Sequence, residues 1–305
     1  MNKLVSVVMC TYNGAHYVQE QINTILSQTH PIEELIIVDD ASSDDTVQLI
    51  SQLAKKNERI KLFCNQINLG YTLNFQKAIQ LASFEYIAIA DQDDYWVNTK
   101  LEKMLAAMKP HVACIYCDSV RFSGTIPINP KPNKKNRKIE GSDPIQLAMF
   151  NTVSGHAMII KKSFTKKLPL IPATVYYDWW LAMQATIHGG IQFFPEILVY
   201  QRAHENNVTI QKGLSEKQHR NAYRKMLQLH LIAWLAIPNL DATQVKFFKT
   251  FHTLWSQSLH QSINIRLFCF LVKHHKELFY YKVRKFPLIS AVKVSFLFSF
   301  NRGER

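Results

Sequence analysis

The stretch Tyr86-Ile87-Ala88-Ile89-Ala90-Asp91-Gln92-Asp93-Asp94 decides the fold of this 305-residue chain. Residues 86–90 form a short apolar run, which is typical of a buried strand in a parallel sheet. Three carboxylates follow it, and carboxylates are costly to bury unless something positive binds there. Open α/β sheets bind ligands at the carboxyl ends of their strands, so the run predicts a site for a divalent metal and phosphates. The alternative is a solvated acidic turn that caps the next helix at Asp94.

Strand and helix patterns alternate on both sides of this stretch. Their rhythm predicts an α/β fold with a mostly parallel sheet and helices on both faces. Residues 123–141 interrupt the rhythm with prolines and a basic cluster, which predicts a mobile surface loop. The expected strands cover residues 5–9, 35–38, 60–64, 86–90, 112–117, part of 152–160, and 192–200 around Pro195, and the expected helices cover 17–26, 44–53, 71–81, 98–108 and 178–187.

The character of the chain changes near residue 211, where it becomes helical, basic and aromatic. We therefore expect one domain over residues 1–210 and a basic, aromatic-rich helical region over 211–305. The whole chain has a net charge of +13, and this basic region could lie on an anionic membrane or pack as a helical appendage. The basic residues follow no nucleic-acid-binding motif, so no specific nucleic acid is expected.

Membrane spanning and secretion are not indicated by the sequence. No apolar segment reaches the roughly 18 residues that cross a bilayer, and the N-terminus reads as a first strand instead of a signal peptide. The five cysteines are odd in number, and Cys114 and Cys117 lie in an expected strand with no second pair to complete a zinc site. Reduced thiols in a cytoplasmic protein are expected.

Polar side chains also follow the first two expected strands. After the first, Gly14 permits a sharp turn and Tyr12 offers a flat face for a base, although a plain turn would look the same. After the second come Asp39 and Asp40, which could accept hydrogen bonds from a nucleobase or a ribose. Helix capping could account for Ser43 and Asp44 but not for this acidic pair.

Two further clusters lie later in the chain. Asp178 is flanked by aromatic residues, and partial desolvation would raise its pKa and suit it to act as a general base. Trp179 or Trp180 could stack on a sugar ring, whereas the alternative is an N-cap aspartate before an amphipathic helix. Farther on, Arg202 is a candidate phosphate contact and His204 a candidate metal ligand, although a lone histidine is more often an ordinary residue.

Six motifs in order carry a resemblance to a known family: VSVVMCTYNG, IIVDDASSDDT, NLGY, YIAIADQDDYW, YYDWW and YQRAHENNVT. Together they resemble family 2 glycosyltransferases of the GT-A fold, most closely the bacterial rhamnosyltransferase-like members, over roughly residues 3 to 210. The resemblance implies that residues 1–210 form the catalytic domain. It also implies a nucleotide-sugar donor, a divalent Mn²⁺ or Mg²⁺ ion and an inverting mechanism.

The resemblance also implies roles for individual residues. Asp178 would be the catalytic base, and Asp93 and His204 would hold the metal. Two positions depart from the family pattern, since Cys10 stands where many members carry Thr or Ser, and Tyr177 where many carry Glu or His. Donor-binding roles fall on Cys10, Tyr12, Asp40, Asn68, Gly70, Asp91 and Arg202.

The expected activity is hexosyl transfer to a cell-surface polysaccharide or glycolipid. The donor would be a dTDP- or UDP-sugar such as dTDP-rhamnose, and the acceptor a saccharide or a lipid-linked saccharide. The C-terminal region would allow peripheral contact with the cytoplasmic face of the membrane. The alternative is a non-catalytic nucleotide-sugar or glycan-binding module of the same fold; a dehydrogenase is excluded because no G-x-G-x-x-G follows the first strand.

Overall fold

The computed structural model describes residues 3–204, 213 and 215–300. The chain forms two compact units. Unit 1 comprises residues 1–132, 140–142 and 153–207, and unit 2 comprises residues 133–139, 143–152 and 208–305. The domain boundary expected at residue 210 lies outside the described residues. Within the described residues, no helix is long and apolar enough to cross a membrane.

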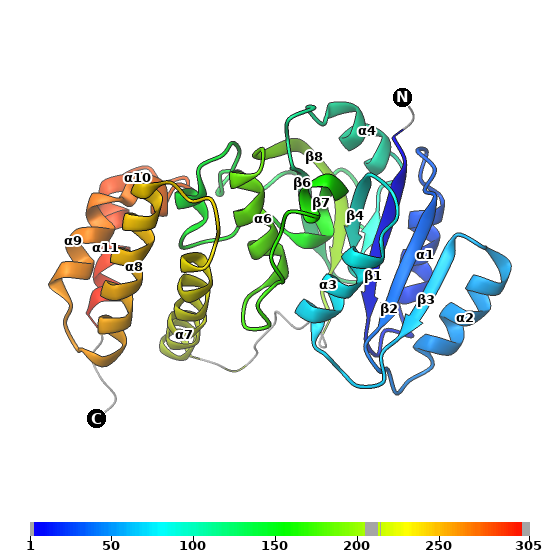
Figure 1. Cartoon of the computed structure of the whole chain (residues 1–305), viewed down its shortest axis with the longest axis horizontal. Coiled ribbons are helices and arrows are strands. Elements are labelled where there is room, and N and C mark those ends of the chain that lie inside the picture. The colour runs from blue at the N-terminus through cyan, green and yellow to red at the C-terminus, as the bar shows by residue number, and fades with distance from the viewer. Residues whose placement is uncertain (1–2, 205–212, 214, 301–305) are drawn as a thin grey trace. The chain divides into compact units, whose positions relative to one another are not determined.

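Unit 1 is built on an eight-stranded sheet with the order β3-β2-β1-β4-β7-β6-β8-β5 (Figure 1). The first four strands in this order are parallel neighbours, as the sequence predicts. β7 is antiparallel to both of its neighbours and β5 is antiparallel to β8, so the sheet is mixed beyond β4. The strands are β1 (Val5–Thr11), β2 (Glu34–Asp39), β3 (Ile60–Cys64), β4 (Tyr86–Ala90), β5 (Tyr95–Trp96), β6 (Cys114–Phe122), β7 (Met158–Lys161) and β8 (Ile191–Arg202).

Helices cover both faces of this sheet. Alternate residues of the central strands pack with α1 and α4 in one continuous apolar core, and α3 packs against β1 and β2 with side chains outside that core. Every residue of β2 is buried, which fits a parallel strand covered on both faces. The helices of unit 1 are α1 (Val18–Leu26), α2 (Thr46–Lys56), α3 (Tyr71–Leu81), α4 (Lys100–Ala107), α5 (Lys162–Thr165) and α6 (Tyr177–Ile187), with a 3₁₀ turn η2 (Gly155–Ala157).

β8 passes through the proline that interrupts its sequence pattern. Its pairing with β6 runs from Phe194 directly to Ile197, and the register shifts opposite Cys117 and Asp118. A proline cannot donate a hydrogen bond to a ladder, so Pro195 fits only where the strand bulges. The bulge lets one long strand continue to Arg202.

Unit 2 is helical, as the composition of the C-terminal region indicates. Its helices surround an aromatic core that includes the fully buried Trp234 and Trp255. The segment 133–139, expected to be a mobile loop, instead pairs with residues 281–283, where Arg137 N–H donates to the Tyr281 carbonyl at 2.6 Å. The elements are η1 (Pro144–Leu147), α7 (Glu216–Leu235), α8 (Ala242–His260), α9 (Ile265–Lys273), α10 (His275–Leu278) and α11 (Pro287–Ser299).

Candidate functional site

The loops that follow β1 and β4 are joined by the side chain of Gln92. Its Oε1 accepts a hydrogen bond from Tyr12 N–H at 3.0 Å, and its Nε2 donates to the Tyr12 carbonyl at 3.1 Å. A Cβ at Gly14 would lie only 2.1 Å from Gln92 Oε1, so a larger residue there would displace the Gln92 side chain from this position. The Tyr12 side chain is 49% exposed and remains available to a ligand. Gln92 is not among the site residues predicted from the sequence, and its only signal there is its place inside the acidic run.

Cys10 lies at the end of β1, facing the same region. Burial first, and then the charges of Asp91 and Asp40, raise the pKa of its thiol well above the ordinary value. The thiol therefore stays protonated and acts as a small, weak hydrogen-bonding group.

Asp40 organises the loop that leads into α3. Its Oδ1 accepts from Leu69 N–H at 2.8 Å, and its Oδ2 accepts from Gly70 N–H at 2.9 Å. Gly70 has a φ of +80°, a conformation that favours glycine, and Asn68 Nδ2 donates to the Asp40 carbonyl at 3.2 Å. The structure thus joins Asp40, Asn68 and Gly70. Both oxygens of the buried Asp40 carboxylate already accept hydrogen bonds within the protein, so any bond to a base would be an additional one.

The end of β8 is held against the acidic run. His204 Nε2 lies 2.6 Å from Asp93 Oδ2, and the imidazole stacks on the Tyr17 ring with centroids 4.7 Å apart. Arg202 Nε donates to the Asp93 carbonyl at 3.3 Å, and its guanidinium forms an ion pair with Glu20. Arg202 therefore connects β8 to the acidic run in this structure, and its predicted phosphate contact stays a prediction.

A second histidine, which sequence analysis missed, lies on the other side of the run. His156 Nδ1 is 3.4 Å from Asp91 Oδ2 and 3.8 Å from Asp94 Oδ2, and its Nε2 is 3.1 Å from Ser119 Oγ. Burial lowers the pKa of His156, but the charges of Asp94 and Asp91 prevail and raise it overall. His156 sits in the short turn η2, where no sequence pattern separates it from the other histidines.

Asp94 is the most deeply buried acid of the run, with 1% of its surface exposed. Its Oδ1 accepts from Arg202 N–H at 3.3 Å, and its Oδ2 accepts no hydrogen bond from the part of the chain that the structure describes. Burial raises the pKa of Asp94, against the lowering effect of the His156 charge. Because Asp94 is buried in this way, the solvated acidic turn considered from the sequence does not describe it.

A buried lysine contacts the segment that carries His156. Lys100 Nζ donates to the His156 carbonyl at 2.8 Å and lies 3.2 Å from the centroid of the Trp96 ring. Burial lowers the pKa of Lys100 to about 7, although the nearby groups Cys117, Asp94 and Asp91 raise it. Lys100 thus fixes the backbone that carries His156.

Asp178 lies in the first turn of α6, where the positive end of the helix favours a carboxylate. The Trp179 N–H donates to its Oδ1 at 2.6 Å. Burial raises the pKa of Asp178 to about 6, that hydrogen bond lowers it, and the charge of Asp91 raises it further. The His156 charge also acts on Asp178, so the carboxyl lies in the field of the acidic run.

Trp179 and Trp180 do not present stacking faces in this structure. Their exposed fractions are 2% and 1%, because successive helical positions turn away from Asp178 into the interior. Neither indole is therefore exposed enough to stack on a sugar ring in this structure. The neighbouring exposed aromatic side chain is Tyr176, at 44%.

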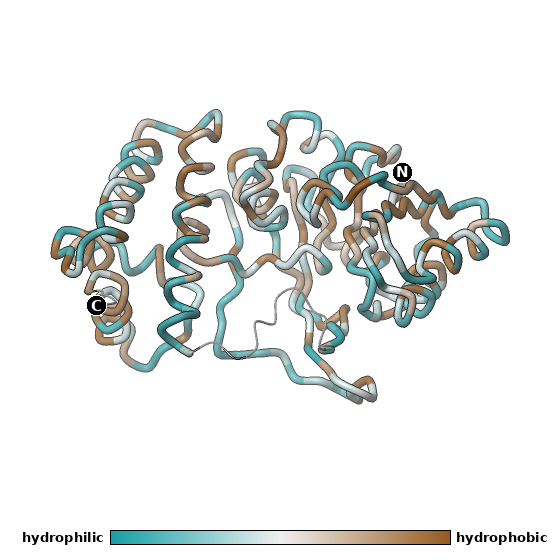
Figure 2. Tube along the Cα trace, turned by 90° about the horizontal axis from the view of Figure 1, so that it is seen from below, coloured by the Kyte–Doolittle hydropathy of each residue, from teal (hydrophilic) through white to brown (hydrophobic). Residues whose placement is uncertain are grey.

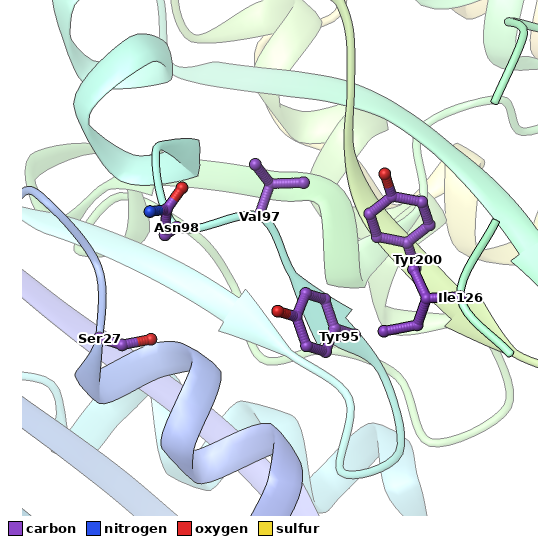
Figure 3. Close-up of a pocket in the computed structure, with 6 residues that line it drawn as sticks. All are labelled: Ser27, Tyr95, Val97, Asn98, Ile126 and Tyr200. Atoms are coloured by element: carbon purple, nitrogen blue, oxygen red, sulfur yellow. The ribbon is translucent and has the colours of Figure 1, made fainter. Parts of the chain in front are cut away.

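A cavity of about 530 Å³ opens beside β5 and β8 (Figure 3). Its lining residues are Ser27, Tyr95, Val97, Asn98, Ile126 and Tyr200. None of the predicted site residues lines it, so it is separate from the cluster described above.

The acidic run has the donor set that a divalent cation requires. Asp91, Asp94 and His156 offer ligand atoms that all lie within 4.8 Å of one another. Asp93 and His204 form a second pair with an oxygen and a nitrogen in contact. Carboxylate oxygens suit Mg²⁺ and Mn²⁺, and the buried Oδ2 of Asp94 lacks a hydrogen bond within the described chain. The residues therefore fit a cation.

Comparisons with known proteins agree with this fold. The chain is 28% identical over 237 residues to a candidate teichuronic acid biosynthesis glycosyltransferase of Bacillus subtilis, covering 75% of this chain and 90% of the relative. It is 35% identical over 114 residues to an Escherichia coli UDP-Glc:α-D-GlcNAc-diphosphoundecaprenol β-1,3-glucosyltransferase, covering 37% of this chain and 44% of that protein.

Solved structures share the fold at low sequence identity. S. aureus TarS (residues 1–349) with UDP-GlcNAc superposes with a TM-score of 0.61 at 17% identity, covering 90% of this chain and 81% of that 1–349 fragment. A Pyrobaculum calidifontis mannosyltransferase with GDP-Man and Mn²⁺ gives 0.58 at 16% identity, covering 95% and 78%. The fold is GT-A-like, with the C-terminal helices added. Residues 6–167, more than half of the chain, match the model of glycosyl transferase family 2, and the chain belongs to that family.

Proposed function

We propose that this glycosyltransferase is an inverting, metal-dependent hexosyltransferase. It moves a sugar from a nucleotide-sugar donor to a hydroxyl of a growing cell-surface polysaccharide or glycolipid. The observation that carries the proposal is the position of Asp178, a carboxyl with a pKa near 6 in the field of the acidic run. A general base works best with a pKa near the operating pH, and a base beside a phosphate-binding edge suits attack on a donor held there.

The donor would bind across the carboxyl ends of the first strands. The exposed Tyr12 ring offers a face to the base, and Cys10 and Asp40 lie beside it. Asn68 and Gly70 shape the loop that Asp40 organises. We assign Asp91 to the ribose and sugar, and Arg202 to the diphosphate.

A divalent ion, Mn²⁺ or Mg²⁺, would bind at the acidic run, and the proposed ligands are Asp93 and His204. Such an ion would neutralise diphosphate oxygens and stabilise the charge that develops as the nucleotide leaves.

Asp178 would remove the proton from the acceptor hydroxyl. The acceptor oxygen attacks the anomeric carbon while the bond from that carbon to the nucleoside diphosphate breaks on the opposite face. One displacement inverts the anomeric configuration, so the enzyme needs no nucleophile of its own.

The name of one relative supports a proposal for the donor and the acceptor. The Escherichia coli relative is named for UDP-Glc and a diphosphoundecaprenol-linked acceptor. By analogy we propose a UDP-sugar as donor, with dTDP-rhamnose as the competitor, and a lipid-linked saccharide as acceptor. Such an acceptor would place the enzyme at the cytoplasmic face of the membrane, in peripheral contact through the C-terminal region.

The test is product analysis with a panel of UDP-hexoses and dTDP-rhamnose on lipid-linked saccharides. Proton NMR of the new linkage is expected to show the anomeric configuration opposite to that of the donor. Retention of configuration would contradict the single displacement. Nucleotide binding with no transfer to any acceptor of this class would instead favour the non-catalytic module.

A further inference from the structure

Helix α11 is built with its small residues inside and its large apolar residues outside. Ala291, Ser295 and Ser299, four residues apart, are the buried positions of the helix. Ile289 and Phe296 are 69% and 53% exposed. A surface helix of a globular protein normally buries its large apolar stripe, so α11 has the opposite arrangement.

The orientation of α11 is fixed by contacts within unit 2. It packs against α9, and the Asn264 N–H donates to the Ser299 carbonyl at 2.9 Å. Phe298 faces inward, with its ring centroid 5.4 Å from that of Trp255, and its carbonyl accepts a hydrogen bond from Arg224. The apolar side of α11 is therefore exposed although the helix is packed in place within unit 2.

The exposed apolar residues extend beyond α11 and form one face. Ile263 pairs with Phe300, whose ring stacks on Phe296 with centroids 4.4 Å apart, so the start of α9 adjoins the end of α11. In Figure 2, brown stretches lie beside the C-terminal mark, among white and teal ones. We call this the α11 face, and its members are Ile263, Ile265, Phe286, Ile289, Val292 and Phe296, each at least 39% exposed.

Basic residues surround the α11 face. Residues 261–300 contain seven Lys or Arg and one acidic residue, which gives a net charge of +6 (seven minus one). Arg284 and Lys285 are exposed just before α11, and Lys293 is exposed on its outward side. Two copies of so basic a face would repel each other, whereas anionic headgroups would be attracted.

α11 is too short to cross a bilayer, and its length fits a helix that lies on the membrane surface. α11 has 13 residues, which is roughly 20 Å at 1.5 Å per residue, and the hydrocarbon core is roughly 30 Å thick. A lysine on the apolar side can extend its charged end to the headgroups while its stem stays among apolar groups.

We propose that the α11 face binds the surface of an anionic phospholipid membrane. α11 lies in the plane of the interface, with Ile289 and Phe296 among the acyl chains and Arg284, Lys285 and Lys293 at the headgroups. This inference deepens the proposed function and rests on its lipid-linked acceptor, which would be presented at such a surface.

The test is sedimentation of the full chain with vesicles of phosphatidylcholine alone and of phosphatidylcholine mixed with phosphatidylglycerol. We expect wild type to bind the mixed vesicles, and Ile289→Ser/Phe296→Ser to bind them at least about tenfold more weakly, because two apolar anchors are lost. Arg284→Gln/Lys285→Gln/Lys293→Gln is expected to lose the preference for phosphatidylglycerol. The matched control is Leu170→Ser in unit 1, where Leu170 is 70% exposed, and it is expected to bind like wild type.

Three results would overturn the inference. The first is wild-type protein that binds neither vesicle, and the second is a Leu170→Ser variant as impaired as the α11 variant. The third is an oligomer, seen by sedimentation velocity, that Ile289→Ser/Phe296→Ser dissociates while vesicle binding is unchanged, which would make the face an interface between copies. Titration of the same samples with UDP and with dTDP separates the two proposals. Vesicle binding without binding of either nucleotide contradicts the function, whereas nucleotide binding without vesicle binding contradicts only the membrane surface.

Discussion

The acidic run after β4 buries carboxyl groups, whereas the α11 face exposes large apolar side chains. Globular proteins usually have the opposite distribution. In unit 1, Asp94 is buried with 1% of its surface exposed; in unit 2, Ile289 is 69% exposed. Buried charge and exposed apolar surface both cost free energy in an isolated protein. Each arrangement makes sense if a partner compensates it, a cation and diphosphate at the acidic run and lipid at the α11 face.

The two regions also differ in how they are built. The acidic run depends on residues far apart in the chain, since His156, Asp178 and His204 come from separate elements. The α11 face comes mainly from one helix and the segment before it. Substitutions at the acidic run should therefore change chemistry, and substitutions on the α11 face should change where the enzyme is located.

The largest expected effect is at Asp178. Asp178→Asn removes the proton acceptor, and kcat is expected to fall about 10³-fold, since general base catalysis typically contributes 10²–10⁴-fold. The affinity for the nucleotide, measured by calorimetry, should stay near the wild-type value. The control is Asp45→Asn, an exposed acid before α2. Turnover within a few-fold of wild type in Asp178→Asn would remove Asp178 from the mechanism.

The next comparison is between the two histidines of the acidic run. His204→Ala is expected to weaken Mn²⁺-dependent nucleotide binding at least about tenfold, because one proposed ligand is lost. His156→Gln is expected to weaken it less, because the Asp93–His204 pair remains. Calorimetric titration of each variant, with and without Mn²⁺, gives the answer. If His156→Gln weakened binding more than His204→Ala, the ion would be assigned to Asp91, Asp94 and His156 instead.

The pH dependence of transfer should reflect the pKa of Asp178, which is about 6. The carboxyl must be ionised to accept a proton, so kcat is expected to fall about tenfold per unit as pH drops below that value. The residual activity of Asp178→Asn should lack this acid limb. A wild-type rate that is flat down to pH 5 would mean that another group acts as base.

The smallest effect concerns stability in unit 2, away from the acidic run. His230 is buried, its Nδ1 bonds the Met226 carbonyl at 2.9 Å, and burial lowers its pKa to about 4. Between about pH 6.5 and pH 4 the unfolded chain binds the extra proton, so the free energy of unfolding falls as pH falls, by at most about 1.4 kcal/mol per unit.

His230→Gln should flatten this dependence in urea unfolding followed by circular dichroism. The matched control is His219→Gln, at an exposed position of the same helix, which should leave the dependence unchanged. An equal slope in wild type and His230→Gln would exclude His230 as the cause.

The sequence predicts the first half of unit 1 well because its strands are short apolar runs at regular spacing. β3 and α3 have the predicted bounds, and β1 to β4 pair in parallel. The antiparallel placement of β7 could not be predicted, since strand direction within a sheet is set by tertiary pairing. The pairing of residues 133–139 was missed for the same reason, because prolines and lysines locally favour a loop.

The site was predictable where a motif repeats a known chemistry and not where packing alone brings groups together. Asp93 and His204, which the motifs predict as metal ligands, lie in contact, and their role as ligands stays a prediction. His156, Gln92 and Lys100 carry no local pattern, and only the fold joins them to the acidic run. Trp179 and Trp180 look accessible beside an acid in the sequence, but their helical phase turns them into the core.

The most direct test of the central claim is calorimetric titration of the full chain with UDP, dTDP, GDP and CDP, first with Mn²⁺ and then with EDTA. The account predicts binding of UDP or dTDP that requires the metal and is weakened by Asp93→Ala. Binding that is unaffected by EDTA, or no binding of any nucleotide by folded protein, would contradict a metal-dependent donor site at the acidic run.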